Sequence, residues 1–333
     1  MLCFDKLKMV TSLDYINDID MKCFTAQYRG DELVSCSYKG KVPSLMIKVD
    51  YEKNELVMEF TSKILGDDSI QLINGDNIKQ CLDRVNGLGI CLLDTGNILV
   101  NSSVVKCDVT RDIVYPDVSL IQGYMATHVK NCRNWTCENY RGNVVLRKVV
   151  QTDRYKKRLV VYDKSKELGN SKNKAFLDSL FDKDKLMEYY KGKVRFELNL
   201  TTREGIRKGL GIESTALNEV LNSTSNPLLA LLDEALDFSE TVAPGTLSLN
   251  DYKCKCVLEV NGYDLARVEE TFRGLISPKT PVSQVMKPYR DLLNRLQAGA
   301  SKITPGASGV ICCLTLSVKS NKSSGVLILK ISP

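Results

Sequence analysis

KVRFELNL, residues 193–200, alternates apolar and polar side chains along its whole length. Alternation with a period of two is typical of a β-strand whose two faces meet different surroundings. One face would carry Val194, Phe196 and Leu198, and the other Arg195, Glu197 and Asn199. The apolar face predicts a buried sheet, and the polar face is either solvated or functional.

Similar strand-like runs occur through the first two hundred residues, at 44–51, 54–62, 102–110, 143–151 and 158–164. The short turn at 52–54 favours antiparallel pairing of the runs on either side of it. Helices are expected at 76–86, where apolar residues recur on one face, and at 174–191, where the charged middle suggests a break. Strands with inserted helices and no regular βαβ alternation predict an α+β fold built mainly on an antiparallel sheet.

The residue pattern changes after Gly211 from strand-like runs to two apolar helical stretches on either side of a segment rich in Ser, Thr and Asn. Further helices are expected at 263–275 and 281–297, followed by strand-like runs at 309–318 and 324–332. These features divide the chain into a domain at 1–212, a helical linker region at 213–250 and a smaller, mostly helical domain at 251–333.

Composition narrows the class of protein. The 333 residues are 43% hydrophobic and 26% charged, as in ordinary globular proteins. No apolar run approaches the roughly 20 residues of a membrane span, and the amino terminus lacks the apolar core of a signal peptide. We therefore expect the cytoplasm as the location, which becomes the host bacterial cytoplasm under the resemblance described below, and no membrane partner. No GxxxxGK[ST] loop occurs, so no nucleotide cofactor is expected.

The twelve cysteines are scattered over a long chain, and we expect them to be reduced. None of the closest pairs has the CxxC spacing of a zinc site. Cys254 and Cys256 fall in an apparent strand.

Positive charge is concentrated between His128 and Lys166, a stretch that contains eleven Lys or Arg residues and only three acidic residues. Such a run is often only a solvated surface, but phosphate-backbone binding also requires it. The candidate DNA-binding residues in this stretch are Lys130, Arg133, Arg141, Arg147, Lys148, Arg154, Lys156, Lys157 and Arg158.

Three of the strand-like segments carry polar groups that a simple core does not need. Asp108, Glu197 and Glu167 would converge on a divalent cation if these strands are neighbours, with His128 as a further candidate ligand. Oxygen ligands suit Mg²⁺ or Mn²⁺, which polarise a phosphodiester. Tyr162, at the end of an apolar strand, could then attack phosphorus, with the metal, Lys164 or Lys166 assisting its deprotonation.

Each of these residues also has an ordinary explanation. A tyrosine at a strand end is usually a packing residue. An acid beside an arginine on a strand usually makes a cross-strand ion pair. A single histidine is more often structural than a ligand.

The combination of motifs resembles the gene II/X family of phage and plasmid replication proteins, the rolling-circle initiators of filamentous bacteriophages. The resemblance rests on LVVYDKSKEL (159–168), KVRFELNL (193–200), TREGIRKGLGI (202–212) and KCDVT (106–110), and covers roughly residues 45–212. It implies that residues 1–212 form an origin-nicking endonuclease domain with Tyr162 as the nicking tyrosine. Lys164 and Glu167 belong to its motif, and Asp108 and Glu197 are its acidic partners.

What the resemblance implies is metal-dependent nicking of one origin strand through a 5′-phosphotyrosine intermediate, followed by strand rejoining. The partners would be single-stranded and origin double-stranded DNA, with a host polymerase and helicase. Many rolling-circle initiators bind metal through two histidines, whereas this chain has one, so an altered metal site or lost activity are both open. The alternatives are a DNA-binding regulator without nuclease activity, or a relaxase or transposase with the same chemistry.

Overall fold

The structure is a computed structural model that describes residues 1–299 apart from 39, 41, 43–44, 116–117, 131–133, 141, 150–156, 238–247, 262–264, 274 and 276–279. The strand-like runs expected at 309–318 and 324–332 lie outside the described residues.

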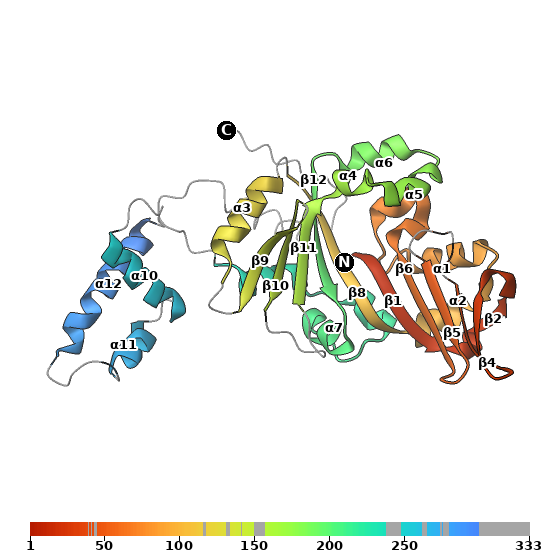
Figure 1. Ribbon diagram of the computed structural model, residues 1–333, viewed down its shortest axis with the longest axis horizontal. Helices are drawn as coiled ribbons and strands as arrows, with labels where there is room; N and C mark the ends of the chain where they lie inside the picture. Colours follow the sequence, from red (N-terminus) through yellow and green to blue (C-terminus); the bar gives the residue numbers. More distant parts are fainter. Residues whose placement is uncertain are drawn as a thin grey trace.

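Ten strands of the described chain form one sheet, in the order β3-β4-β5-β6-β1-β8-β12-β11-β10-β9, and every neighbouring pair is antiparallel. Figure 1 shows the sheet running from β9 to β4 across the molecule. The strands are β1 (Phe4–Ser12), β3 (Thr25–Arg29), β4 (Glu32–Tyr38), β5 (Leu45–Asp50), β6 (Glu55–Thr61), β8 (Ser103–Val114), β9 (Trp135–Tyr140), β10 (Asn143–Lys148), β11 (Lys157–Asp163) and β12 (Lys193–Leu200). A two-stranded sheet pairs β2 (Ile16–Ile19) with β7 (Cys91–Leu93).

The helices are inserted between strands or follow the last one. They are η1 (Leu13–Tyr15), η2 (Met21–Cys23), η3 (Ser62–Gln71), α1 (Ile78–Gly87), α2 (Thr95–Asn101), α3 (Val118–His128), α4 (Lys164–Leu168), η5 (Ser171–Asn173), α5 (Lys174–Asp178), α6 (Lys183–Tyr190), α7 (Arg203–Leu210), α8 (Leu217–Asn222), α9 (Pro227–Ala235), α10 (Leu249–Val260), α11 (Leu265–Arg273) and α12 (Val282–Gly299). This arrangement confirms the expected α+β class with a large antiparallel sheet.

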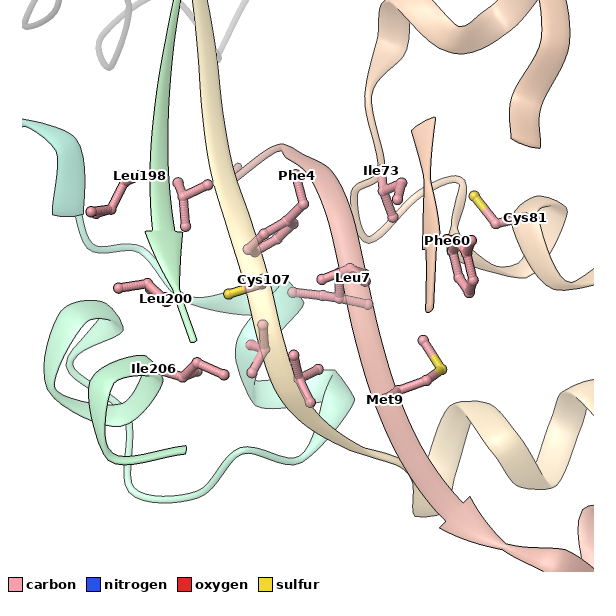
Figure 2. Packing of buried hydrophobic residues seen from close by; sticks show 14 of the residues in the cluster. Phe4, Leu7, Met9, Phe60, Ile73, Cys81, Cys107, Leu198, Leu200 and Ile206 are labelled. Carbon is pink, nitrogen blue, oxygen red and sulfur yellow. The ribbon is translucent and has the colours of Figure 1, made fainter. Parts of the chain in front are cut away.

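One face of the sheet is the main hydrophobic core. Phe196 and Leu198 of β12 are buried there as their alternation predicts. Figure 2 shows Leu198 beside this core with Leu7 of β1 and Cys107 of β8. Helix α7 lies close against this face because Gly209 has no side chain, and a Cβ there would come within 3.2 Å of Leu200. Close approach of this kind explains a glycine in the RKGLG motif.

Helices α8 and α9, within the segment expected as a linker at 213–250, pack in the same core. Leu217 and Val220 of α8 and Leu231 of α9 are buried members of the cluster that includes the sheet. Residues up to 236 therefore share the hydrophobic core of residues 1–212. The following segment, 238–247, lies outside the described residues.

The opposite face of the sheet is covered at one end by a cap made of α4, α5 and α6. Leu168, Phe176, Leu186 and Tyr190 form a separate small core inside this cap. Figure 1 shows these helices together at one end of β11 and β12. The sequence predicted a helix at 174–191 with a break, and the break is confirmed, because Asp182 caps a new helix by accepting from the Lys185 backbone N–H at 2.9 Å.

The carboxy-terminal helices α10, α11 and α12 have a hydrophobic cluster of their own, with Cys254, Leu258, Val268, Met286 and Leu292 buried. The expectation that Cys254 and Cys256 lie in a strand is wrong, because both lie in α10. Cys254 and Leu258 are four residues apart and are buried together, which is helical spacing. The alternation that suggested a strand was only a few residues long.

The other expected elements are confirmed within a few residues. The runs at 44–51, 54–62, 102–110, 143–151, 158–164 and 193–201 are β5, β6, β8, β10, β11 and β12. The helices expected at 76–86, 263–275 and 281–297 are α1, α11 and α12. The nine cysteines in the described part of the chain are free thiols.

Candidate functional site

A cavity of about 770 Å³ lies on the polar face of the sheet, beside the cap. Strands β8, β12 and β11 are adjacent, so their polar side chains project into one space. Five residues that the sequence singled out line this cavity, namely Asp108, Tyr162, Lys164, Glu167 and Glu197. The structure therefore brings together residues separated by up to 89 positions, as the difference between 197 and 108 shows.

The phenol of Tyr162 is held by a carboxylate. Its hydroxyl donates a hydrogen bond to Glu197 Oε2 at 2.9 Å, and only 8% of the residue is exposed. Burial and the nearby negative charge of Glu197 raise the pKa of Tyr162 well above its usual value. Tyr162 is thus oriented but neutral, and its reactivity depends on a group that can take its proton.

Glu197 and Asp108 are joined by an amide. Asn199 Nδ2 donates to Asp108 Oδ1 at 2.9 Å and to Glu197 Oε1 at 3.1 Å. Burial raises the pKa of both carboxyl groups, and for Glu197 the nearby acids Asp5 and Asp108 raise it further. Burial and the neighbouring acids therefore outweigh the charge of Lys6, which lies 3.9 Å from Asp108.

Lys164 and Glu167 form a second polar cluster at the edge of the cavity. The strand does not continue through Lys164, because Asp163 caps α4 by accepting from the backbone N–H groups of Ser165 and Lys166. The Lys164 side chain is 6% exposed, and its Nζ donates to Glu167 Oε2 at 2.8 Å.

The Glu167 carboxylate is fully engaged by these neighbours. Its Oε1 accepts from Lys172 at 2.9 Å and from Asn173 at 3.2 Å. Burial alone would raise the pKa of Glu167, but the Lys164 charge and the three hydrogen bonds lower it to about 2. Glu167 is therefore a charged partner of lysines in this structure.

Arg195 anchors the floor of the site. It is opposite Tyr162 in the β11–β12 register and is completely buried. Its guanidinium donates to both oxygens of Asp112 at 2.7 and 2.8 Å, to Asp5 at 2.7 Å and to the Tyr190 hydroxyl of the cap at 3.1 Å. Arg195 thus joins three strands and the cap beneath the phenol.

Asp5 is a member of the site that the sequence did not reveal. A register irregularity between Phe4 and Lys6 displaces it from the regular alternation of β1, and it lines the cavity. The signal available in the sequence was FDKL at 4–7, where the apolar Phe4 and Leu7 are three residues apart; both are buried in the structure. An i,i+3 spacing of buried residues within a strand indicates a bulge.

The donor set of the cavity fits one divalent cation only in part. Among the described residues, no three His, Cys, Asp or Glu side chains converge closely enough to surround a metal ion. Asp108 and Glu197 remain as oxygen donors, with the Asn199 amide nitrogen between them, and Mg²⁺ is often held by one or two carboxylates plus substrate phosphate and water. These residues therefore fit Mg²⁺ or Mn²⁺ with substrate bound. His128 ends α3 and does not line the cavity.

The basic residues predicted to bind DNA are divided between two faces of the sheet. Lys148 contacts Glu234 of α9 at 2.7 Å, Lys157 also pairs with Glu234, and Lys130 donates to the Asp233 carbonyl. Arg147 and Arg158 are on the polar face, where Arg147 pairs with Glu138 and Arg158 lines the cavity. Lys166 is highly exposed outside the cavity, 3.7 Å from Asp163. Arg133, Arg141, Arg154 and Lys156 lie outside the described residues.

Cations that the sequence did not single out also line the cavity, namely Lys6, Lys63, Lys106 and Lys172. They come from β1, β8 and the segments after β6 and α4, far from the basic run at 128–166. Only the folded sheet brings them beside Tyr162.

Every helix in the described part of the chain is too short or too polar to traverse a lipid bilayer. No protein-family model matches the chain, and a comparison with curated proteins found no significant match. What the cavity does must therefore be inferred from its own residues.

Proposed function

We propose that this protein is a rolling-circle replication initiator that nicks one strand of origin DNA with Tyr162 as the nucleophile. The observation that carries the proposal is the Tyr162–Glu197 hydrogen bond inside a cavity lined by cations. A packing tyrosine needs neither an acidic acceptor nor adjacent phosphate-binding charge. In this proposal the antiparallel sheet with its inserted helices is the nuclease core, and the helices from residue 251 onward are an accessory domain.

The chemistry assigned to the chain's own residues begins with the phenol proton. Glu197 Oε2 accepts this proton as the Tyr162 oxygen forms a bond to phosphorus, and its raised pKa suits it to this role. The bond from phosphorus to the 3′ oxygen breaks, and that oxygen takes a proton from water to become a 3′ hydroxyl. The 5′ phosphate stays on Tyr162 as an ester, so the reverse reaction can rejoin strands without a nucleotide.

Charge on the phosphate oxygens is met by Lys106 and Arg158, which line the cavity. A divalent ion, Mg²⁺ or Mn²⁺, held by Asp108 and Glu197 would supply further stabilisation of that charge. Lys164 is hydrogen-bonded to Glu167, so its role is to hold Glu167 and the start of α4 in position beside the Tyr162 phenol.

The experiment that tests this proposal incubates the protein with labelled single-stranded DNA carrying the replicon's own origin, with and without Mg²⁺ or Mn²⁺. We expect a metal-dependent nick with the 5′ end linked to protein, lost in Tyr162→Phe and in Glu197→Gln. Tyr189→Phe is the matched control, because Tyr189 is a half-exposed tyrosine that does not line this cavity. It should nick as the unaltered protein does.

The alternatives correspond to other outcomes of this experiment. Cleavage that survives in Tyr162→Phe would remove Tyr162 as the nucleophile. DNA binding with no cleavage under any metal would favour a regulator. Nicking of a transfer-origin or transposon-end sequence but not of a replication origin would favour a relaxase or transposase. A host polymerase and helicase are the partners that the nicked product would require.

A further inference from the structure

We infer that a single strand of DNA lies across the polar face of the sheet, on a cation track formed by Arg147, Arg158, Lys6, Lys106 and Lys8. The choice of DNA as the anion rests on the proposed function. The location of the track rests on the strand register alone. It differs from the basic run at 128–166 because three of its five members come from β1 and β8.

The track follows two neighbouring rows of the sheet. Lys6 is opposite Asp108, Asp108 is opposite Asn199, and Asn199 is opposite Arg158. Lys6 and Arg158 are therefore three strands apart, about 14 Å at the usual spacing between strands. Arg147 continues this row on β10, and Lys8 and Lys106 lie in the next row on β1 and β8.

Like charges face each other directly at two points on this track. Lys8 is the cross-strand partner of Lys106, and Arg147 is the cross-strand partner of Arg158. Directly opposed like charges on one face of a sheet are destabilising. Glu138 offsets the charge of Arg147 in the second pair. No such close acid offsets the Lys8–Lys106 pair, whereas an anion lying between these two lysines would be bound by both.

Arg147 of the track is paired with Glu138, but the other four cations make no close ion pair with acids of the described part of the chain. Lys6 is 3.9 Å from both Glu59 and Asp108, and Lys8 is 3.6 Å from Glu59, which are beyond hydrogen-bonding distance. In the described part of the chain, neither Lys106 nor Arg158 has an ion pair. On the other face of the sheet, Lys148 is bound to Glu234 at 2.7 Å.

The form of DNA follows from where the track leads. It runs alongside the cavity that contains Tyr162, a residue with only 8% of its surface exposed. A phosphodiester has to leave the regular surface of a duplex to reach that phenol, whereas a single strand can bend into the cavity. A basic surface that follows the backbone is the usual way to bind a single strand without regard to its sequence.

The test measures binding of a fluorescein-labelled thymidine oligonucleotide of about 15 nucleotides by anisotropy, without divalent metal. We compare Lys8→Ala/Lys106→Ala with Lys130→Ala/Lys148→Ala, which removes two charges from the other face. The first variant should bind at least tenfold more weakly and lower the slope of log K against log salt by about 1.4. The second should bind within about twofold of the unaltered protein.

Two further measurements separate the track from general damage. Lys8→Ala/Lys106→Ala should melt no lower than the unaltered protein, because it relieves a like-charge pair. Glu59→Gln should bind more tightly, because Glu59 is the acid nearest to both Lys6 and Lys8.

Several results would overturn the inference, namely equal losses in the two double variants, equal binding of a duplex of the same length, or equal competition by polyglutamate. None of these results depends on cleavage. If the track variants bind normally while the unaltered protein nicks origin DNA, the track is wrong and the proposed function stands. If the track variants lose binding and no origin DNA is nicked, the surface is right and the nuclease is wrong.

Discussion

The two faces of strands β8, β12 and β11 are built from the same stretches of sequence and behave in opposite ways. On one face, Phe196 and its neighbours are packed against helices in a continuous apolar core. On the other, Tyr162, Glu197 and Asp108 surround a cavity with charges that repel or attract one another. The first face is organised for stability, and the second holds an arrangement that folding by itself disfavours.

The contrast is not simply between buried and exposed. Arg195 lies on the polar side of β12 by alternation and is nevertheless completely buried, because the cap covers that end of the strand. The polar face therefore has a closed part at Arg195 and an open part at Glu197 and Asn199. Substitutions in each part should change stability differently, and the following four predictions run from the largest expected effect to the smallest.

Phe196→Ala should lower the free energy of unfolding by about 4 kcal/mol, because it leaves a cavity in a fully buried site. Urea unfolding followed by circular dichroism measures the change. Val160→Ala, on the open part of the polar face one strand away, should cost less than about 1 kcal/mol. Equal losses at the two positions would mean that the faces do not differ as described.

Arg195→Leu should lower the free energy of unfolding by about 3 kcal/mol, because it leaves the carboxylates of Asp112 and Asp5 without their partner. Arg158→Leu is the control, an arginine on the open part of the same face. It should change stability by about 0.5 kcal/mol or less. A change below about 1 kcal/mol in Arg195→Leu would show that the closed part of the face tolerates unpaired acids.

Glu167→Gln should lower stability at pH 7 by about 2 kcal/mol, since Lys164 is buried and loses its charged partner. The pKa of Glu167 is about 2 when folded, against about 4.3 for an unperturbed glutamate. Its contribution is therefore complete above about pH 4.3 and is lost as the pH falls toward 2.

The test of this prediction is the difference in melting temperature between the unaltered protein and Glu167→Gln, measured from pH 7 down to pH 2. The difference should shrink across the acid range. A difference that stays constant over that range would assign the effect to packing and not to the charge of Glu167.

Glu197→Gln should raise stability by about 1 kcal/mol near neutral pH in the absence of metal. Burial and neighbouring acids raise the pKa of Glu197, so its stabilising effect is present below the unfolded pKa and is lost as the pH rises through the folded pKa. The uncharged glutamine side chain of Glu197→Gln does not ionise, so the variant does not lose stability as the pH rises.

Thermal melting with and without Mg²⁺ tests whether Glu197 binds the metal ion. Mg²⁺ should raise the melting temperature of the unaltered protein and have little effect on Glu197→Gln, because a bound ion stabilises the folded state by mass action. Asp163→Asn, an acid outside the cavity, should respond to Mg²⁺ as the unaltered protein does. Equal metal responses in all three would remove Glu197 as a ligand.

Much of the fold could be predicted from local patterns, since strands such as KVRFELNL show their two faces by alternation alone. The prediction failed at Cys254, where a short alternation lay within a helix whose partners are α11 and α12. It also missed Asp5, because the bulge that turns this side chain toward the cavity depends on how β1 pairs with β8.

By itself, the sequence determined the α+β class, the position of most strands and which side chains share a face, because these follow from the geometry of a single extended chain. It also placed Tyr162, Lys164, Glu167, Asp108 and Glu197 as one group of candidates. Only the tertiary structure decided that Glu167 is bound to lysines and that Glu197 holds the phenol. It alone showed that Lys148 meets Glu234 of α9 whereas Arg158 lines the cavity, since the partners on each face come from distant parts of the chain.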